Sequence, residues 1–159
     1  MKSRVIRLFA KQAALGGGLL CFGPGVAGAQ AVNSVTVSGS PAAMTITTAT
    51  AGFAPNSVTN GVTTYTAKAK KATIPQKITG MLNTVMPVGM TLTVNLAAPT
   101  GATSNGPVTL DATARDLVGN ITNTTVQTRS ITYVISATPA AGVVAPQSRT
   151  VTFTITAWP

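Results

Sequence analysis

Strict alternation of apolar and hydroxyl-bearing residues is the sequence feature that most limits what this chain can fold into. Near its end, Val151, Phe153 and Ile155 alternate with threonines. Because successive side chains of a β-strand point to opposite faces, such a segment has one apolar and one polar face. The same period of two recurs in segments 35–38, 44–47, 64–68, 78–82, 91–96, 108–115, 131–137 and 151–157. We therefore expect about eight half-buried strands.

Turn-forming residues separate these segments and support the same fold class. Proline, glycine and asparagine gather at Ser40-Pro41, Asn60-Gly61, Pro99-Thr100-Gly101, Asn105-Gly106-Pro107 and Gly119-Asn120. No window shows a strong helical period. Frequent turns between short alternating strands are typical of an all-β, antiparallel β-sandwich, here of about 7–9 strands.

The N-terminal residues have the pattern of a secretory signal peptide. Four basic residues among the first eleven precede an apolar stretch at 13–22, and the small residues Ala27-Gly28-Ala29 follow. The stretch is about half of the ~20 residues that a membrane-spanning helix needs, and no later run is longer. We expect cleavage after Ala29, which leaves an N-terminal arm or first strand at 30–41, a β-sandwich domain at 42–159 and no transmembrane span.

The chain that remains after cleavage lacks most of the side chains that enzymes use. It contains no His, Cys or Glu, and its only acids are Asp111 and Asp116. Catalysis near neutral pH mostly depends on His, thiolate or paired carboxylates. We expect Asp111 on the outward face of a strand, paired with a basic residue, and Asp116 in the following turn. The sequence therefore predicts a protein that is not an enzyme, with no catalytic residue, cofactor or metal site.

Two segments resemble known families. Residues 108–121 (VTLDATARDLVGNI) resemble the strand-and-turn segment of bacterial immunoglobulin-like domains, which implies an immunoglobulin-like sandwich. Residues 150–158 (TVTFTITAW) resemble the last strand of chaperone-usher pilin subunits. In that family the sandwich lacks one strand, which the N-terminal arm of the next subunit supplies. The resemblance implies subunit contacts through the two terminal strands, at Val35, Val37, Val151, Phe153, Ile155 and Trp158.

The basic residues Lys68, Lys70 and Lys71 form the main concentration of charge in the predicted domain. Such a cluster either contacts an anionic polymer or protects an edge strand from unwanted pairing, and we favour the second interpretation. Nucleic acid is not an expected partner, because few aromatic residues lie between the basic ones. Trp158 is interpreted as an interface or edge anchor, with a sugar-stacking platform as the alternative.

These observations favour a structural role. The leading hypothesis is a secreted, non-enzymatic subunit of a surface assembly, located in the periplasm or at the cell surface, that associates with copies of itself by β-strand addition. The alternative is an immunoglobulin-like adhesin that binds glycan or an anionic envelope polymer through Lys68, Lys70, Lys71 and Trp158. Each hypothesis makes a different part of the molecule its functional site.

Overall fold

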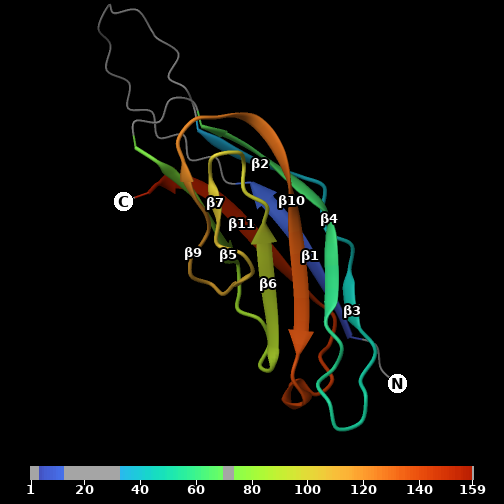
Figure 1. The fold of residues 1–159 in the computed structure, drawn as a ribbon. Helices are drawn as coiled ribbons and strands as arrows, with labels where there is room; N and C mark the ends of the chain where they lie inside the picture. The colour runs from blue at the N-terminus through green and yellow to red at the C-terminus, as the bar shows by residue number, and fades with distance from the viewer. Residues whose placement is uncertain (1–3, 13–32, 70–73, 159) are drawn as a thin grey trace, which may run out of the picture.

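The structure, a computed structural model, describes residues 4–12, 33–69 and 74–158, and consists almost entirely of β-strands. Two sheets, one of six strands and one of five, pack face to face (Figure 1). This arrangement confirms the expected all-β sandwich. The described residues contain eleven strands, against the expected seven to nine, because two pairs of residues form very short strands and one strand lies within the predicted leader.

The six-stranded sheet has the order β3-β1-β11-β5-β9-β7. Its strands are β3 (Met44–Ile46), β1 (Arg4–Gln12), β11 (Gln147–Ala157), β5 (Gln76–Leu82), β9 (Arg115–Ile121) and β7 (Thr103–Ser104). All its pairings are antiparallel except that of β1 with β11.

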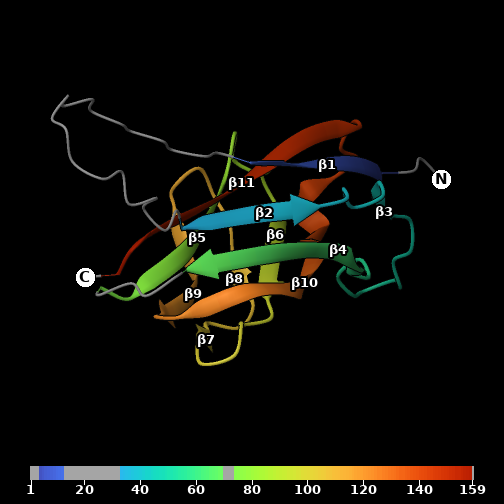
Figure 2. The ribbon, with the colours of Figure 1, turned by 90° about the horizontal axis from the view of Figure 1, so that it is seen from above.

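The five-stranded sheet has the order β2-β4-β10-β6-β8 and is antiparallel throughout. Its strands are β2 (Ser34–Ser38), β4 (Val58–Ala69), β10 (Thr124–Ala137), β6 (Met90–Leu96) and β8 (Val108–Thr109). A single 3-10 turn, η1 (Pro139–Ala141), lies between β10 and β11. Seen from above, β1 and β11 belong to one layer, and β2, β4 and β10 to the other (Figure 2).

The core lies between the two sheets and is built from the apolar phase of the alternation. Its largest fully buried side chains are Tyr65, Tyr133 and Phe153, with leucine and isoleucine from both sheets around them. Full burial of one such aliphatic or aromatic side chain contributes about 1.5–3 kcal/mol. The opposite phase carries threonine and serine, whose hydroxyls pair across strands, as in Thr91 with Ser136 at 2.6 Å. The alternation in the sequence therefore becomes an apolar interior and a hydroxyl-rich surface.

The predicted strand over 108–115 is wrong in its extent, because local hydrogen bonds interrupt it. β8 ends at Thr109 and β9 begins at Arg115. Between them the Asp111 carboxylate accepts a hydrogen bond from the Thr113 N–H at 2.8 Å. An aspartate that bonds to the backbone two residues later stabilises a turn and competes with a regular strand.

The predicted turn at Gly119-Asn120 is also wrong, since both residues lie inside β9. Two residues of β9, Gly119 and Asn120, stand opposite the single residue Lys77 of β5, which defines a β-bulge. Asn120 has a φ of 56°, a left-handed conformation that asparagine adopts more readily than most residues. A turn and a bulge both need such a residue, so the sequence signal was the same for either.

Candidate strand-binding site

β11 (Gln147–Ala157) is the centre of the candidate site, because each of its edges is paired with a different kind of strand. On one edge it pairs antiparallel with β5, from Val151 opposite Leu82 to Ala157 opposite Gln76. On the other edge it pairs parallel with β1, from Ile6 opposite Gln147 to Gln12 opposite Phe153. One edge is therefore completed by the sandwich domain and the other by the N-terminal segment.

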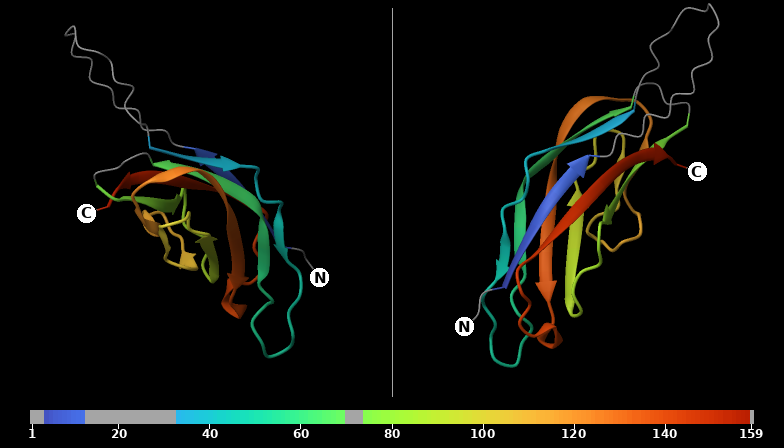
Figure 3. Two further views of the ribbon diagram at one scale, coloured as in Figure 1. Left: turned by 45° about the horizontal axis from the view of Figure 1, so that its top comes forward. Right: turned by 180° about the vertical axis from the view of Figure 1, so that it is seen from behind.

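β3 (Met44–Ile46) is the strand that borders the site on the side opposite β11. Within the described residues it pairs with β1 alone in its sheet, with Arg4 opposite Ile46 and Ile6 opposite Met44. The rear view in Figure 3 follows β1 between β3 and β11. We call this sheet position, between β3 and residues 147–153 of β11, the β3–β11 slot.

The occupant of the slot lies within the predicted leader. The sequence pattern assigns Lys2, Arg4, Arg7 and Lys11 to the basic region of that leader and predicts no strand there. RVIRLFAKQ has no strict period of two and contains Arg4, Arg7 and Lys11, so sequence patterning gave no signal of a strand. The apolar segment and the cleavage motif of the leader lie outside the described residues.

The predicted contact residues of β11 have inward-facing side chains. Val151 and Phe153 are fully buried, and Ile155 is partly buried. Thr150, Thr152 and Thr154 occupy the alternate phase and remain partly exposed. These apolar side chains therefore belong to the core of their own sandwich. What β11 offers to another strand is its backbone edge together with the outer row of threonines.

The predicted contact residues Val35 and Val37 lie in β2 (Ser34–Ser38) at the edge of the five-stranded sheet. They pair with Ala67 and Tyr65 of β4 and not with β11. Val35 is 9% exposed, and Val37 packs partly against the core. β2 is a terminal strand of its sheet, so among the described residues it has a paired strand on only one of its two edges.

Trp158 makes a contact within its own chain. The indole ring of Trp158 lies against Gly119 in β9, where an added Cβ would come within 3.0 Å of the ring. The backbone N–H of Trp158 donates to the Pro75 carbonyl at 2.7 Å. The side chain is 37% exposed. Trp158 thus fixes the end of β11 against the bulged part of β9, and sequence reasoning found the residue without finding this contact.

The basic cluster is only partly described. Lys68 lies in β4 opposite Ser34 of β2, whereas Lys70 and Lys71 lie outside the described residues. Lys68 belongs to the five-stranded sheet and Trp158 follows β11 of the six-stranded one. The structure therefore does not place these two candidate binding residues in the same sheet.

The two acids have exchanged the places that the sequence predicted for them. Asp116 lies in β9 and forms a cross-strand ion pair with Lys77 of β5 at 3.1 Å. Asp111 lies in the turn and pairs with Arg115 four residues later. The hydrogen bonds from Arg115 and from the Thr113 N–H lower the pKa of Asp111 below its usual range. Each carboxylate therefore serves a local ion pair.

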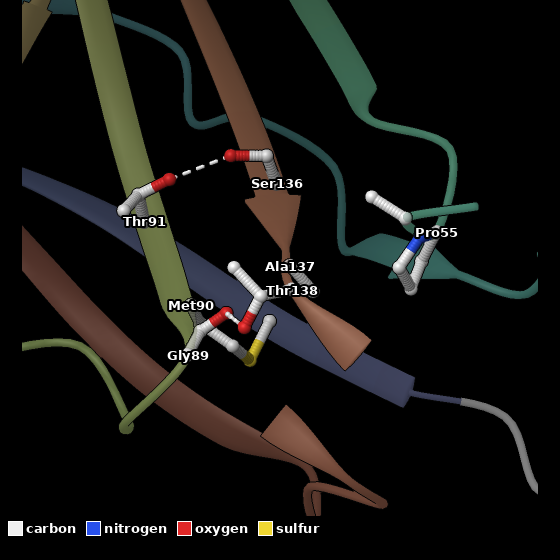
Figure 4. A pocket seen from close by; sticks show the side chains of 8 residues that line it. Pro55, Gly89, Met90, Thr91, Ser136, Ala137 and Thr138 are labelled. Carbon is white, nitrogen blue, oxygen red and sulfur yellow. Dashed lines mark hydrogen bonds between the residues drawn. The ribbon is translucent and has the colours of Figure 1, made fainter. Parts of the chain in front are cut away.

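A cavity of about 370 Å³ lies at the ends of β6 and β10. Figure 4 shows that the hydroxyls of Thr91 and Ser136 face one another at its edge, with Pro55 approaching from a separate loop. Its lining consists of Ala54, Pro55, Gly89, Met90, Thr91, Ser136, Ala137 and Thr138. None of these side chains titrates near neutral pH, so this lining has no acid or base for proton transfer.

The described residues contain neither a cluster of metal ligands nor a membrane-spanning helix. No three His, Cys, Asp or Glu residues group there as potential metal ligands. The same part of the chain has no helix of the length and apolarity that a bilayer crossing requires.

Comparison with known proteins adds no family assignment. No protein-family model matches the chain, and no curated protein matches it. The geometry of the β3–β11 slot is therefore the main evidence for a function.

Proposed function

We propose that this chain is a secreted, non-enzymatic structural subunit of a cell-surface assembly, such as a filament, pilus or coat, whose copies are joined by β-strand addition. The observation that carries the proposal is that the β3–β11 slot holds a strand from the predicted leader. Cleavage after Ala29 removes β1, so residues 147–153 lose their partner on one edge. An unpaired strand edge is a template for another strand.

The arm of the same chain cannot refill the whole slot by folding back beside β3. If the arm formed a hairpin with β3, the arm residue opposite Met44 would be Pro41 or an earlier residue. In the structure, Ile6 of β1 occupies that place opposite Met44. All earlier arm residues would then continue toward Ile46 and beyond it. The places of residues 7–12, which pair with residues 148–153 of β11, would stay empty.

The arm of the same chain cannot enter the β3–β11 slot in the opposite orientation either. Running antiparallel to β11 would make the arm parallel to its neighbour β3. A parallel connection needs a crossover of about a dozen residues or more, but only five residues separate Ser38 from Met44. The geometry therefore favours an arm supplied by a second copy.

A second copy's arm also gains hydrogen bonds by entering the slot. In its own fold the arm forms β2, which pairs on one edge with β4 over five residue pairs. In the slot a strand has partners on both edges, β11 and β3. Since each net hydrogen bond contributes about 0.5–1.5 kcal/mol, a second ladder favours transfer of the arm between copies.

Deleting residues 30–40 tests this proposal. The deleted chain keeps its slot but has no arm to donate, so we expect monomers by sedimentation and no polymers by electron microscopy of the exported protein. A chain with Val35→Ile and Val37→Ile, which keeps length and alternation, should assemble normally. Mixed with intact chains, the deleted chain should shorten the polymers, because it accepts an arm and passes none on. Normal polymers from the deleted chain alone would refute the proposal.

A further inference from the structure

We infer that the leader of this protein is a cap for the β3–β11 slot, and that its removal is the event that makes a copy competent to assemble. The inference builds on the proposed function and on cleavage after Ala29. It starts from the pairing of β1 with a strand on each side: Ile6–Gln12 pairs with β11, and Arg4–Ile6 pairs with β3. The cap thus occupies the place that the proposed function assigns to the arm of another copy.

Occupation of the slot is exclusive. β1 uses one edge of β11 from Gln147 to Phe153, while the other edge is already paired with β5 from Val151 onward. Each strand has only two edges. An arm from another copy therefore cannot pair with this edge of Gln147–Phe153 while β1 is present.

The tether makes the cap effective before cleavage. A strand on the same chain competes at an effective concentration in the millimolar range, whereas an arm from a second copy competes at the concentration of the free protein. At micromolar protein, the leader has an advantage on the order of a thousandfold from the tether alone. Cleavage removes that advantage, so the arm of another copy can occupy the slot and form a polymer.

The test uses the full chain with its cleavage motif blocked by Ala29→Leu, so that the leader stays attached. A second chain adds Leu8→Pro, and a matched control adds Leu8→Val. Leu8 lies opposite Arg149, inside the part of β1 that pairs with β11 and beyond the part that pairs with β3. Proline lacks the N–H of a ladder residue and is disfavoured inside a paired strand, while valine keeps it. Hydrogen exchange of backbone amides in residues 147–153 measures slot occupation, and sedimentation measures assembly.

The cap predicts protected amides and monomers for the blocked chain and for the Leu8→Val control. With Leu8→Pro, the amides of residues 147–153 that face β1 should exchange roughly a hundredfold faster in the monomer, before assembly. The uncleaved chain should then polymerise. Unchanged exchange in β6 and β10 identifies a chain that is still folded. Adding the free peptide RVIRLFAKQ to the cleaved protein should restore protection at residues 147–153 and slow assembly.

The outcomes separate the cap from the proposed function. If Leu8→Pro exposes residues 147–153 but the chain stays monomeric, the cap stands and assembly by strand addition fails. If the blocked chain with intact β1 polymerises as readily as the cleaved protein, the cap is refuted and the proposed function stands. Equal protection of residues 147–153 in the monomers with and without Leu8→Pro also refutes the cap.

Discussion

At the scale of single residues, the two buried tyrosines differ in how their hydroxyls are satisfied. The Tyr65 hydroxyl donates to the Ala97 carbonyl at 2.6 Å, whereas the Tyr133 hydroxyl has no hydrogen-bond partner among the described residues. Both side chains are fully buried, and burial raises the pKa of each phenol well above its usual range. The pair offers a matched comparison of a satisfied and an unsatisfied buried group.

Replacing each tyrosine with phenylalanine should therefore give different results. Tyr65→Phe removes the hydrogen bond to the Ala97 carbonyl, which costs about 0.5–1.5 kcal/mol of unfolding free energy. Tyr133→Phe removes an unpaired polar group, so the free energy of unfolding should stay the same or rise. Denaturant unfolding of the two variants measures this difference, and an equal loss from both would contradict our account of the core.

The same residues set the alkaline limit of stability. An unfolded tyrosine ionises near its ordinary pKa of 10.0, while each buried phenol stays protonated to higher pH. Above about pH 10 the unfolded state therefore binds fewer protons than the folded state, and the free energy of unfolding falls as pH rises. Each phenylalanine variant should make this fall less steep, which supplies an independent check on the comparison.

At the scale of elements, the contact between Trp158 and Gly119 joins the end of β11 to the bulge of β9. A Cβ at Gly119 would lie 3.0 Å from the indole ring. Gly119→Ala should thus displace the ring and expose it to solvent. The chain has one Trp, so its fluorescence reports on this contact alone.

We expect the emission of Gly119→Ala to shift toward the red and to be more easily quenched by iodide. Gly101→Ala does not serve as a control, because Gly101 has a φ of 83°. Gly61→Ala does serve, since the nearest atom to its added Cβ lies 3.9 Å away. Wild-type fluorescence from Gly119→Ala would mean that the ring is not held against β9.

The elements also show where sequence patterning succeeds and fails. The alternation predicted β4, β5, β6, β10 and β11, because burial of one strand face imposes a period of two. It missed the bulge in β9 and the break after Thr109, because glycine, asparagine and aspartate give the same signal in turns and bulges. It gave no sign of β1, whose position depends on two unsatisfied neighbouring edges more than on its own pattern.

The pairing of the candidate site could not be predicted for a similar reason. The sequence identified β2 and β11 as alternating terminal strands, and both exist. Which strands stand beside them is set by long-range pairing between segments far apart in the chain. Only the structure shows that β2 is an edge strand on β4, while β11 has a leader strand beside it.

At the scale of the whole molecule, the six-stranded sheet is continuous because β1, which lies in the predicted leader, stands between β3 and β11. The exported chain would have an open slot and an arm with a single neighbour, and these two features complement each other between copies. In one copy, the outward-facing row of β11, which includes Thr152, lies on the outer face of the six-stranded sheet. Thr36 in the arm lies on the outer face of the five-stranded sheet. If the arm of a second copy fills the slot, the two rows share the outer face of one sheet.

Disulfide formation between two kinds of chain directly measures whether the arm of a second copy lies beside β11. The predicted exported chain has no Cys, so Thr36→Cys in one population and Thr150→Cys, Thr152→Cys or Thr154→Cys in another introduce the only thiols. Facing residues of paired strands have Cβ atoms about 4.5–5.5 Å apart, within reach of a disulfide when the register matches. We predict a cross-linked dimer of one chain of each kind, at one of the three β11 positions, in assembled protein under oxidising conditions. Polymers that form without a cross-link at any of these positions would contradict strand exchange as the link between copies.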